Sequence, residues 1–294
     1  MLQKESLSRK IFIIFNYIFC CTMALLCIVP LVHILAISLS DAAAVDSGQV
    51  FLWPIGFNLE SYKYVIGNND FLAAFLVSIK RTVLGVSISM FLSVLAGYPL
   101  SRSKHKFHAR PFYVVYFMIT MIMSGGLIPT YLLIANLGFI DTIWALVLPT
   151  AMNISNIILL QNYIKGLPDE LVEAAYADGA GHWTTLWKVI LPLCKPVLAT
   201  LVLFKGVAHW NTWFDGLIYM NNPENYPLQS YLQTVVVNAD IELIQNIDEA
   251  LMENITQRGN KTAQIFVAMI PILLVYPFVQ KHFTGGIVMG SVKG

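Results

Sequence analysis

Six long apolar runs occupy most of this 294-residue chain and restrict what it can fold into. A helix that crosses a lipid bilayer needs about 20 mostly apolar residues. Hydrophobic residues make up 57% of the chain and charged residues only 12%, which is more apolar surface than a water-soluble domain of this size can bury. The sequence therefore predicts an all-α membrane protein. Its six transmembrane helices are expected over residues 11–37, 79–100, 112–135, 143–164, 192–214 and 263–281.

Basic residues precede the first apolar run, as they do in a secretory signal peptide: Lys4, Arg9 and Lys10. A signal peptide has an apolar core of about 7–15 residues and then a small-residue cleavage site. This run is longer, and no convincing cleavage site follows it. We therefore expect it to be retained as a helix.

The basic residues lie mainly in alternate loops. Cytoplasmic loops of membrane proteins carry an excess of Lys and Arg. With the N-terminus inside, the outer segments contain only Lys63, Arg258 and Lys261. The inner segments contain Lys4, Arg9, Lys10, Arg102, Lys104, Lys106, Arg110, Lys165, Lys188, Lys281 and Lys293. Both termini are therefore predicted to be cytoplasmic, and the net charge of +1 gives no reason to expect nucleic acid as a partner.

Two outer segments are too long to be tight turns. The first, residues 38–72, mixes aromatic with polar residues and is expected to contain a short helix at the outer interface. Its anchors would be Trp53, Phe57 and Tyr62.

The second outer segment, residues 215–262, is acidic and is predicted to be partly helical around 239–256. No internal repeat is apparent. We therefore expect one membrane domain, residues 1–294, with 215–262 as its extracellular loop. The cysteines lie in apolar runs and are expected to be buried and inert.

The inner segment 165–191 is a polar stretch between two apolar runs. Asp169 and Glu170 suit the positive end of a helix dipole, which predicts a first helix over 171–177. Gly179 follows the helix and is suited to a tight turn.

A second helix is expected after this turn. Its apolar residues recur at helical spacing, which predicts a stripe on one face: Trp183, Leu186, Trp187 and Ile190. Pro192 and Pro196 are one turn apart and are expected to open the next spanning helix. The residues alone leave two explanations open. The segment is either a stiff unit that enters a cleft in another protein or an ordinary inner loop that is helical.

A motif in this segment resembles the EAA loop of ABC-importer permeases. Glu173-Ala174-Ala175, Gly179 and Val189-Ile190-Leu191-Pro192 match the pattern EAA-x3-G-x9-I-x-LP, with Val189 in place of the isoleucine. Three further stretches are similar to the carbohydrate branch, the maltose-type second permease: "LIPTYLLIANLGFIDTIWALVLP" (127–149), "HWNTWF" (209–214) and "KHFTGGIVMGSVKG" (281–294). Within that branch, the resemblance is greatest to permeases for complex oligosaccharides and uronic-acid glycans.

One departure lies at the start of the second helix. Relatives often carry Asn-Ser there, and this chain has Val77-Ser78. The assignment to the branch is unaffected, but no pore contact of the relatives can be transferred to this position.

The resemblance implies a type I ABC importer permease fold in the bacterial plasma membrane. Such a permease pairs with a second permease, two cytoplasmic ABC ATPase subunits and an extracellular solute-binding protein, and it carries a carbohydrate substrate through a lipid-embedded heterodimer. ATP and magnesium are bound by the ATPases. We therefore expect this chain to hold no cofactor, no metal and no catalytic residue.

The resemblance also implies roles for two groups of residues. The EAA loop would dock on the ATPase through Glu170, Glu173, Ala174, Ala175, Asp178, Gly179, Leu191 and Pro192. The C-terminal tail would contact the ATPase dimer near Gly285, Gly286 and Gly290, the alternative being a flexible end.

Residues suited to sugar binding lie in the fourth and fifth helices. Aromatic faces stack on sugar rings and amides form hydrogen bonds with hydroxyls, which selects Asn153, Asn156, Trp210, Asn211 and Trp213. The alternative is that the tryptophans anchor the membrane interface and the amides join helices.

Several basic residues fall within predicted spans, among them Lys80, Arg81 and Lys205. Lys205 near mid-helix is expected either to line the pore or to pair with a neighbouring subunit. Lys80 and Arg81 are expected to extend to the interface rather than contact substrate.

The residues leave two alternative functions open. A channel or membrane scaffold would not need a docking loop, and a channel should show polar rings repeated in a symmetric pore helix. Only the family resemblance distinguishes a carbohydrate importer from an importer of a non-sugar solute.

Overall fold

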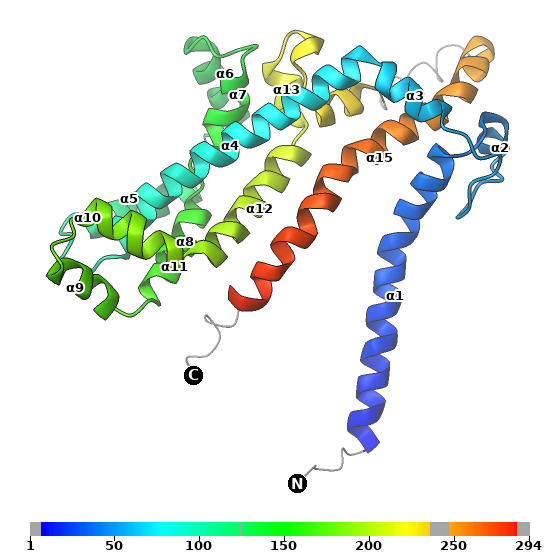
Figure 1. Cartoon of the computed structure of the whole chain (residues 1–294). Coiled ribbons are helices and arrows are strands. Elements are labelled where there is room, and N and C mark those ends of the chain that lie inside the picture. Colours follow the sequence, from blue (N-terminus) through cyan, green and yellow to red (C-terminus); the bar gives the residue numbers. More distant parts are fainter. Residues whose placement is uncertain (1–6, 124, 236–246, 287–294) are drawn as a thin grey trace. The chain divides into compact units, whose positions relative to one another are not determined.

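The computed structural model describes residues 7–123, 125–235 and 247–286, and all regular secondary structure in these ranges is helical (Figure 1). Three continuous helices are long and apolar enough to cross a membrane: α1 (Leu7–Ser38), α4 (Asn69–Ser101) and the Arg258–Pro277 part of α15 (Ile247–Gly286). These correspond to the first, second and sixth predicted spans. α4 begins ten residues before the predicted start at residue 79.

The other three predicted spans are each broken into a bent pair of helices. α5 (Arg110–Ile122) and α6 (Leu127–Asn136) meet at 112°, and Ile143–Thr150 meets α8 (Ile154–Lys165) at 48°. His182–Leu193 meets α12 (Lys195–Asn211) at 79°. Length and composition within the described residues therefore allow three to six spans. Six requires that each bent pair cross the membrane as one unit.

Local chemistry accounts for these bends. Gly126, at φ 79°, precedes α6, a conformation that favours glycine. Between α7 (Ile143–Val147) and α8, a short 3₁₀ turn, η1 (Leu148–Thr150), contains a proline. Asn153 then caps α8, its Oδ1 accepting a hydrogen bond from the amide of Asn156 at 3.1 Å.

The chain divides into two compact units, residues 1–72 with 232–269 and residues 73–231 with 270–294. In the first unit, α1 is followed by α2 (Ala42–Asp46) and α3 (Glu60–Gly67). Ala36, Val45 and Val50 form its small buried cluster.

The predicted interfacial helix in this unit is only partly correct. Tyr62 lies on α3, where its hydroxyl forms a hydrogen bond of 2.8 Å with Ser38. Trp53 and Phe57 precede α3 in an irregular stretch, and they are 82% and 66% exposed. Gly56, at φ 65°, lies between them, so one helix does not carry the three aromatic residues.

The cysteine prediction also needs correction. Cys194 is buried, but Cys20, Cys21 and Cys27 on α1 are exposed in the described chain. The reason is that an apolar helix built to face lipid has no need to bury its small side chains within its own chain.

The second unit is built around α4, α8 and α12, with α8 packed against α12. Its buried core also includes one side of the polar inner segment. The core residues are Val94, Tyr98, Leu160, Ile164, Val172, Leu186, Ile190, Cys194 and Leu201. A smaller cluster joins α6 and α7 to α13 (Phe214–Tyr219), which is followed by the turn η3 (Pro223–Asn225).

A glycine allows α4 and α12 to approach closely. A Cβ added at Gly85 would lie 2.3 Å from Nε2 of His209, a distance that real Cβ atoms do not adopt. His209 is itself only 3% exposed. The interface between these two helices is therefore matched to the absence of a side chain at position 85.

Gly85→Ala is expected to destabilise the second unit by about 1–3 kcal/mol, because the new methyl group forces His209 and α12 to move. Thermal unfolding of the purified protein in detergent measures the effect. Gly206→Ala on α12 is the matched control, since its Cβ would meet only Val86, at 3.9 Å. Equal melting temperatures for the two variants would show that the close approach is unimportant.

Candidate functional site

The polar inner segment folds into a closed helix–turn–helix, which we call the docking hairpin (residues 166–194). Its first arm is α9 (Glu170–Ala177), as predicted. Gly179 adopts φ 80°, and its amide bonds to the carbonyl of Tyr176 while the amide of Ala180 bonds to the carbonyl of Ala175. This pair of bonds is a Schellman motif, which ends a helix in a defined geometry. The turn is therefore set by its backbone.

The second arm differs from the prediction. It runs through α10 (His182–Thr184), a π-helical stretch, η2 (Thr185–Ile190), and α11 (Leu191–Leu193). Leu186 and Ile190 are buried, at 2% and 1% exposure, but Trp183 and Trp187 are 63% and 52% exposed. The predicted stripe on one face is wrong, because the wider π turns place the two tryptophans on a neighbouring face.

The proline prediction is correct for one residue only. Pro196 lies in the first turn of α12, but Pro192 belongs to α11, before the 79° bend. Cys194, between the two helical pieces, is fully buried. The helix after the bend, α12, therefore begins at Lys195.

The docking hairpin is anchored on one side and open on the other. Val172, Ala175, Leu186 and Ile190 are buried, and all but Ala175 belong to the core of the second unit. The predicted coupling residues divide between these two sides. Glu170, Glu173, Ala174, Asp178, Gly179 and Pro192 are exposed, Leu191 is half-buried and Ala175 is buried.

The exposed side of the first arm, α9, is acidic, and Lys106 lies near one of its carboxylates. Nζ of Lys106 lies 3.9 Å from Oε1 of Glu173, and the two side chains are 45% and 66% exposed. An ion pair that long and that exposed contributes little stability. Glu173 is therefore available to a stronger basic partner.

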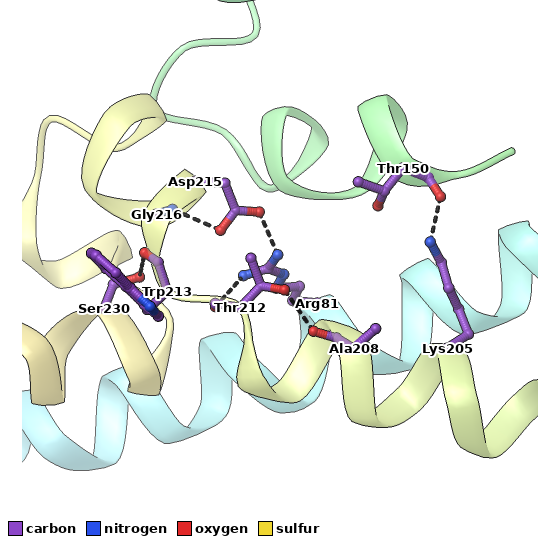
Figure 2. A network of polar contacts seen from close by, with 9 residues as sticks. All are labelled: Arg81, Thr150, Lys205, Ala208, Thr212, Trp213, Asp215, Gly216 and Ser230. Carbon is purple, nitrogen blue, oxygen red and sulfur yellow. Dashed lines mark hydrogen bonds and ion pairs between the residues drawn. The ribbon is translucent and has the colours of Figure 1, made fainter. Parts of the chain in front are cut away.

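A second polar cluster lies where α12 ends. Figure 2 shows Arg81 of α4 directed toward Asp215, with which it forms an ion pair, while its Nη1 donates a hydrogen bond of 3.0 Å to the carbonyl of Thr212. Arg81 is 1% exposed. The prediction that Arg81 extends to the interface is wrong, because a carboxylate within the same unit neutralises the guanidinium.

Lys205 also finds a partner in its own chain. Its Nζ donates a hydrogen bond to the carbonyl of Thr150, in the break between α7 and α8 (Figure 2). The bend in that span leaves carbonyl groups without helical partners, and Lys205 satisfies one of them. Lys205 is 6% exposed, so in this state its ammonium group serves helix packing.

The residues predicted to bind sugar are not gathered into one described site. Asn153 caps α8 and Asn156 is 6% exposed. Trp210 is 5% exposed and packs edge-to-face on Phe75, with ring centroids 5.6 Å apart. Asn211 is exposed, Trp213 is 40% exposed and Asn153 is half-buried, so Asn211 and Trp213 offer the most open surface among these residues.

Two carboxylates with clear structural roles were not selected from the sequence. Besides Asp215, Asp141 adopts φ 61°, and its Oδ1 accepts hydrogen bonds from the amides of Asn221 and Asn222 and from Nδ2 of Asn225. The bond from Asn225 and those from the two amides lower the pKa of Asp141. The sequence around Asp141 gives no indication that its hydrogen-bond donors lie 80 residues further along the chain.

The glycines predicted to contact the ATPase lie at the end of the described chain. Gly285 and Gly286 are the last residues of α15. Gly290 and residues 239–246 of the predicted outer helix lie outside the described residues, and 247–256 are helical within α15.

Apolar helices of spanning length, charged groups buried among them and an exposed polar hairpin are features of a helical membrane protein. Residues 81–288 match the family described as "Binding-protein-dependent transport system inner membrane component". The chain belongs to this family. It is a membrane transport subunit of an ABC transporter and is not itself the catalytic one.

Individual relatives extend the comparison to nearly the whole chain. The polygalacturonan/rhamnogalacturonan transport system permease protein YtcP of Bacillus subtilis is 37% identical over 98% of this chain and 100% of its own length. Protein LplC of the same organism is 38% identical over 97% of this chain and 96% of its own. A solved structure of a bacterial ABC transporter involved in the import of the acidic polysaccharide alginate contains a similar chain, with a TM-score of 0.85 and 32% sequence identity. The match covers 95% of this chain and 99% of that chain.

Proposed function

We propose that this chain forms one half of the pore of an ATP-driven importer of acidic oligosaccharides in a bacterial plasma membrane. The other components would be a second permease, two cytoplasmic ATPases and a solute-binding protein. The observation that supports this proposal most directly is the docking hairpin, a rigid unit with its acidic face exposed in a chain of this family.

The proposed substrate class follows from what the similar proteins carry. One relative is named for polygalacturonan, a polymer of galacturonic acid, and the solved structure belongs to an importer of alginate, an acidic polysaccharide. Both polymers consist of sugars that bear carboxylates. A uronic-acid oligosaccharide is therefore the solute that we propose.

The proposed coupling path begins at Glu173. ATP-driven closure of the ATPases would move the docking hairpin, and Val172, Leu186 and Ile190 would pass this movement to α4, α8 and α12 because they share one packed core. Asn211 and Trp213 are the residues that we propose as open to sugar, and Gly285 and Gly286 as a contact to the ATPase.

The proposed topology can be tested with single cysteines at Ser103 and Glu224, in a background that lacks the four native cysteines. Ser103 lies in the basic loop predicted to be cytoplasmic, and Glu224 lies in the predicted outer segment and is exposed. An impermeant thiol reagent should label position 224 in intact cells and position 103 only after lysis. Labelling of position 103 in intact cells would reverse the orientation.

The proposed partners and substrate are tested by purifying the complex through a tag on this chain. A second permease and two ATPase subunits should co-purify. The associated solute-binding protein should retain an oligogalacturonide and, when loaded, stimulate ATP hydrolysis. Retention of an uncharged solute alone would reject the acidic substrate class.

A further inference from the structure

The proposed coupling path assigns no ligand to a cavity beside the docking hairpin. It encloses about 280 Å³ between the last turns of α4, the stretch 102–107 and the start of the hairpin's second arm. Most of its wall is apolar, with Leu95, Pro99, Phe107 and Leu186 among the lining residues. α4 and α10 lie near each other in Figure 1, at the end of the bundle where α5 begins.

The wall of this cavity contains a guanidinium whose donors are incompletely used. The Cζ atom of Arg102 lies 4.5 Å from the ring centroid of Tyr98, a cation–π contact. Its Nε and Nη2 are buried and have no hydrogen-bond partner in the part of the chain that the structure describes. Unsatisfied donors of a charged group are costly, so an acceptor supplied from outside the chain would be favourable.

Two more basic side chains line the same cavity. Among the described residues, the ammonium group of Lys106 has only a loose contact with Glu173, 3.9 Å long. His182 uses Nδ1 in a hydrogen bond of 2.9 Å with the hydroxyl of Tyr176 on α9, which fixes its ring. Two cationic side chains, Arg102 and Lys106, thus line a small cavity beside His182, and its lining residues include no acid. This charge balance is complementary to an anion.

The position and lining of the cavity indicate which kind of anion fits. It lies at the end of a spanning helix, since Ser101 is the last residue of α4. Trp183 lines it and, like Trp187 on the same arm, is more than half exposed. Tryptophan favours the boundary between lipid and water, and basic pockets at the cytoplasmic side of spanning helices bind anionic head groups. An apolar wall with a basic rim suits a molecule with an acyl chain and a phosphate.

We propose that this cavity binds the phosphate group of an anionic phospholipid from the cytoplasmic leaflet. The proposal rests on the proposed function, because the topology given above places the cavity on that side. A lipid there contacts both the end of α4 and the docking hairpin. Its binding would therefore hold the hairpin in its docking position and raise ATP-driven activity.

The test uses the complete transporter in nanodiscs of phosphatidylcholine with increasing fractions of brominated phosphatidylglycerol. Bromine quenches nearby indoles, and subtracting the signal of the Trp183→Phe complex isolates Trp183. We expect saturable quenching of Trp183 and a parallel rise in ATP hydrolysis. Arg102→Gln should weaken the apparent affinity about fivefold, which is the contribution of one basic residue near a membrane surface. Arg102→Lys should have a smaller effect.

Lys104→Gln is the matched control, because Lys104 is an exposed residue of the same loop and does not line the cavity. Equal weakening by Lys104→Gln and Arg102→Gln would overturn the proposal, since general attraction to the surface would then explain both. Absence of saturable quenching, together with a change of Trp183 fluorescence on addition of millimolar inorganic phosphate, would identify free phosphate as the ligand and reject the lipid. Quenching that appears in the permease pair but disappears on addition of the ATPases would assign the cavity to an acidic side chain of the ATPase.

Failure of this inference is distinguishable from failure of the proposed function. The quenching of Trp183 requires no sugar, and uptake of sugar requires no brominated lipid. A transporter that imports oligogalacturonides without any dependence on Arg102 would reject only the lipid site.

Discussion

Glu173→Lys is expected to abolish most of the ATP hydrolysis that a loaded solute-binding protein stimulates. The exposed carboxylate of Glu173 is proposed to meet a basic group of the ATPase, and reversing its charge puts two like charges in contact. Loss of a buried charge pair at an interface costs about 2–5 kcal/mol, which is a loss of about 30-fold or more in affinity. The measurement is the stimulated ATPase rate of the reconstituted complex, together with the amount of ATPase that co-purifies.

Glu224→Lys is the matched control for this reversal, because it makes the same change at an exposed residue of the predicted outer segment. Gly179→Leu should give a similar loss by a different route. The φ of 80° at this position is unfavourable for residues with a Cβ. No neighbour lies within 4 Å of an added Cβ, so the loss would come from backbone strain and not from a clash. Gly179→Asn should retain more activity, because asparagine tolerates this conformation. Full stimulation in both Glu173→Lys and Gly179→Leu would exclude the docking role.

Arg81→Met is expected to be strongly destabilising, by about 3–5 kcal/mol, because it leaves the carboxylate of Asp215 without its buried partner. The double variant Arg81→Met/Asp215→Leu should recover most of this loss, since removing both charges avoids the uncompensated one. Thermal unfolding of the purified protein in detergent compares the three proteins. Arg81 also donates a hydrogen bond to the carbonyl of Thr212, which neither variant retains. Recovery in the double variant is therefore expected to be incomplete.

Lys80→Met serves as the control at the adjacent position, where the side chain is exposed on the same helix. A small effect there and a large one at Arg81 would attribute the loss to the ion pair. If the double variant is no more stable than Arg81→Met, the pair is not the cause, and the guanidinium acts through its other contacts.

The parts of the fold that sequence alone predicted are those set by neighbouring residues. The first arm of the docking hairpin and its turn depend on an acidic N-terminus and on Gly179, and the structure confirms both. The long apolar runs also predicted the three continuous helices that are long and apolar enough to cross a membrane. Local chemistry was sufficient in these cases because no distant partner is needed.

The features that were missed depend on distant partners or on the path of the backbone. Arg81 and Asp215 are 134 residues apart, so nothing near Arg81 indicates that it is neutralised. Lys205 bonds to the carbonyl of Thr150 only because the span that contains η1 is bent. Hydropathy measures the length of an apolar run, and a bent run has the same hydropathy as a straight one. The exposure of Trp183 was missed for the related reason that a π turn changes which residues share a face.

The central claim is that this chain and its partners use ATP to carry an acidic oligosaccharide inward, and uptake into proteoliposomes tests it most directly. The complete complex would be reconstituted with ATP inside, and the solute-binding protein and a labelled oligogalacturonide outside. The account predicts accumulation of label that requires internal ATP and the binding protein and that is lost in the Glu173→Lys complex. Entry of the oligosaccharide without ATP, or no entry when the wild-type complex hydrolyses ATP, would contradict it.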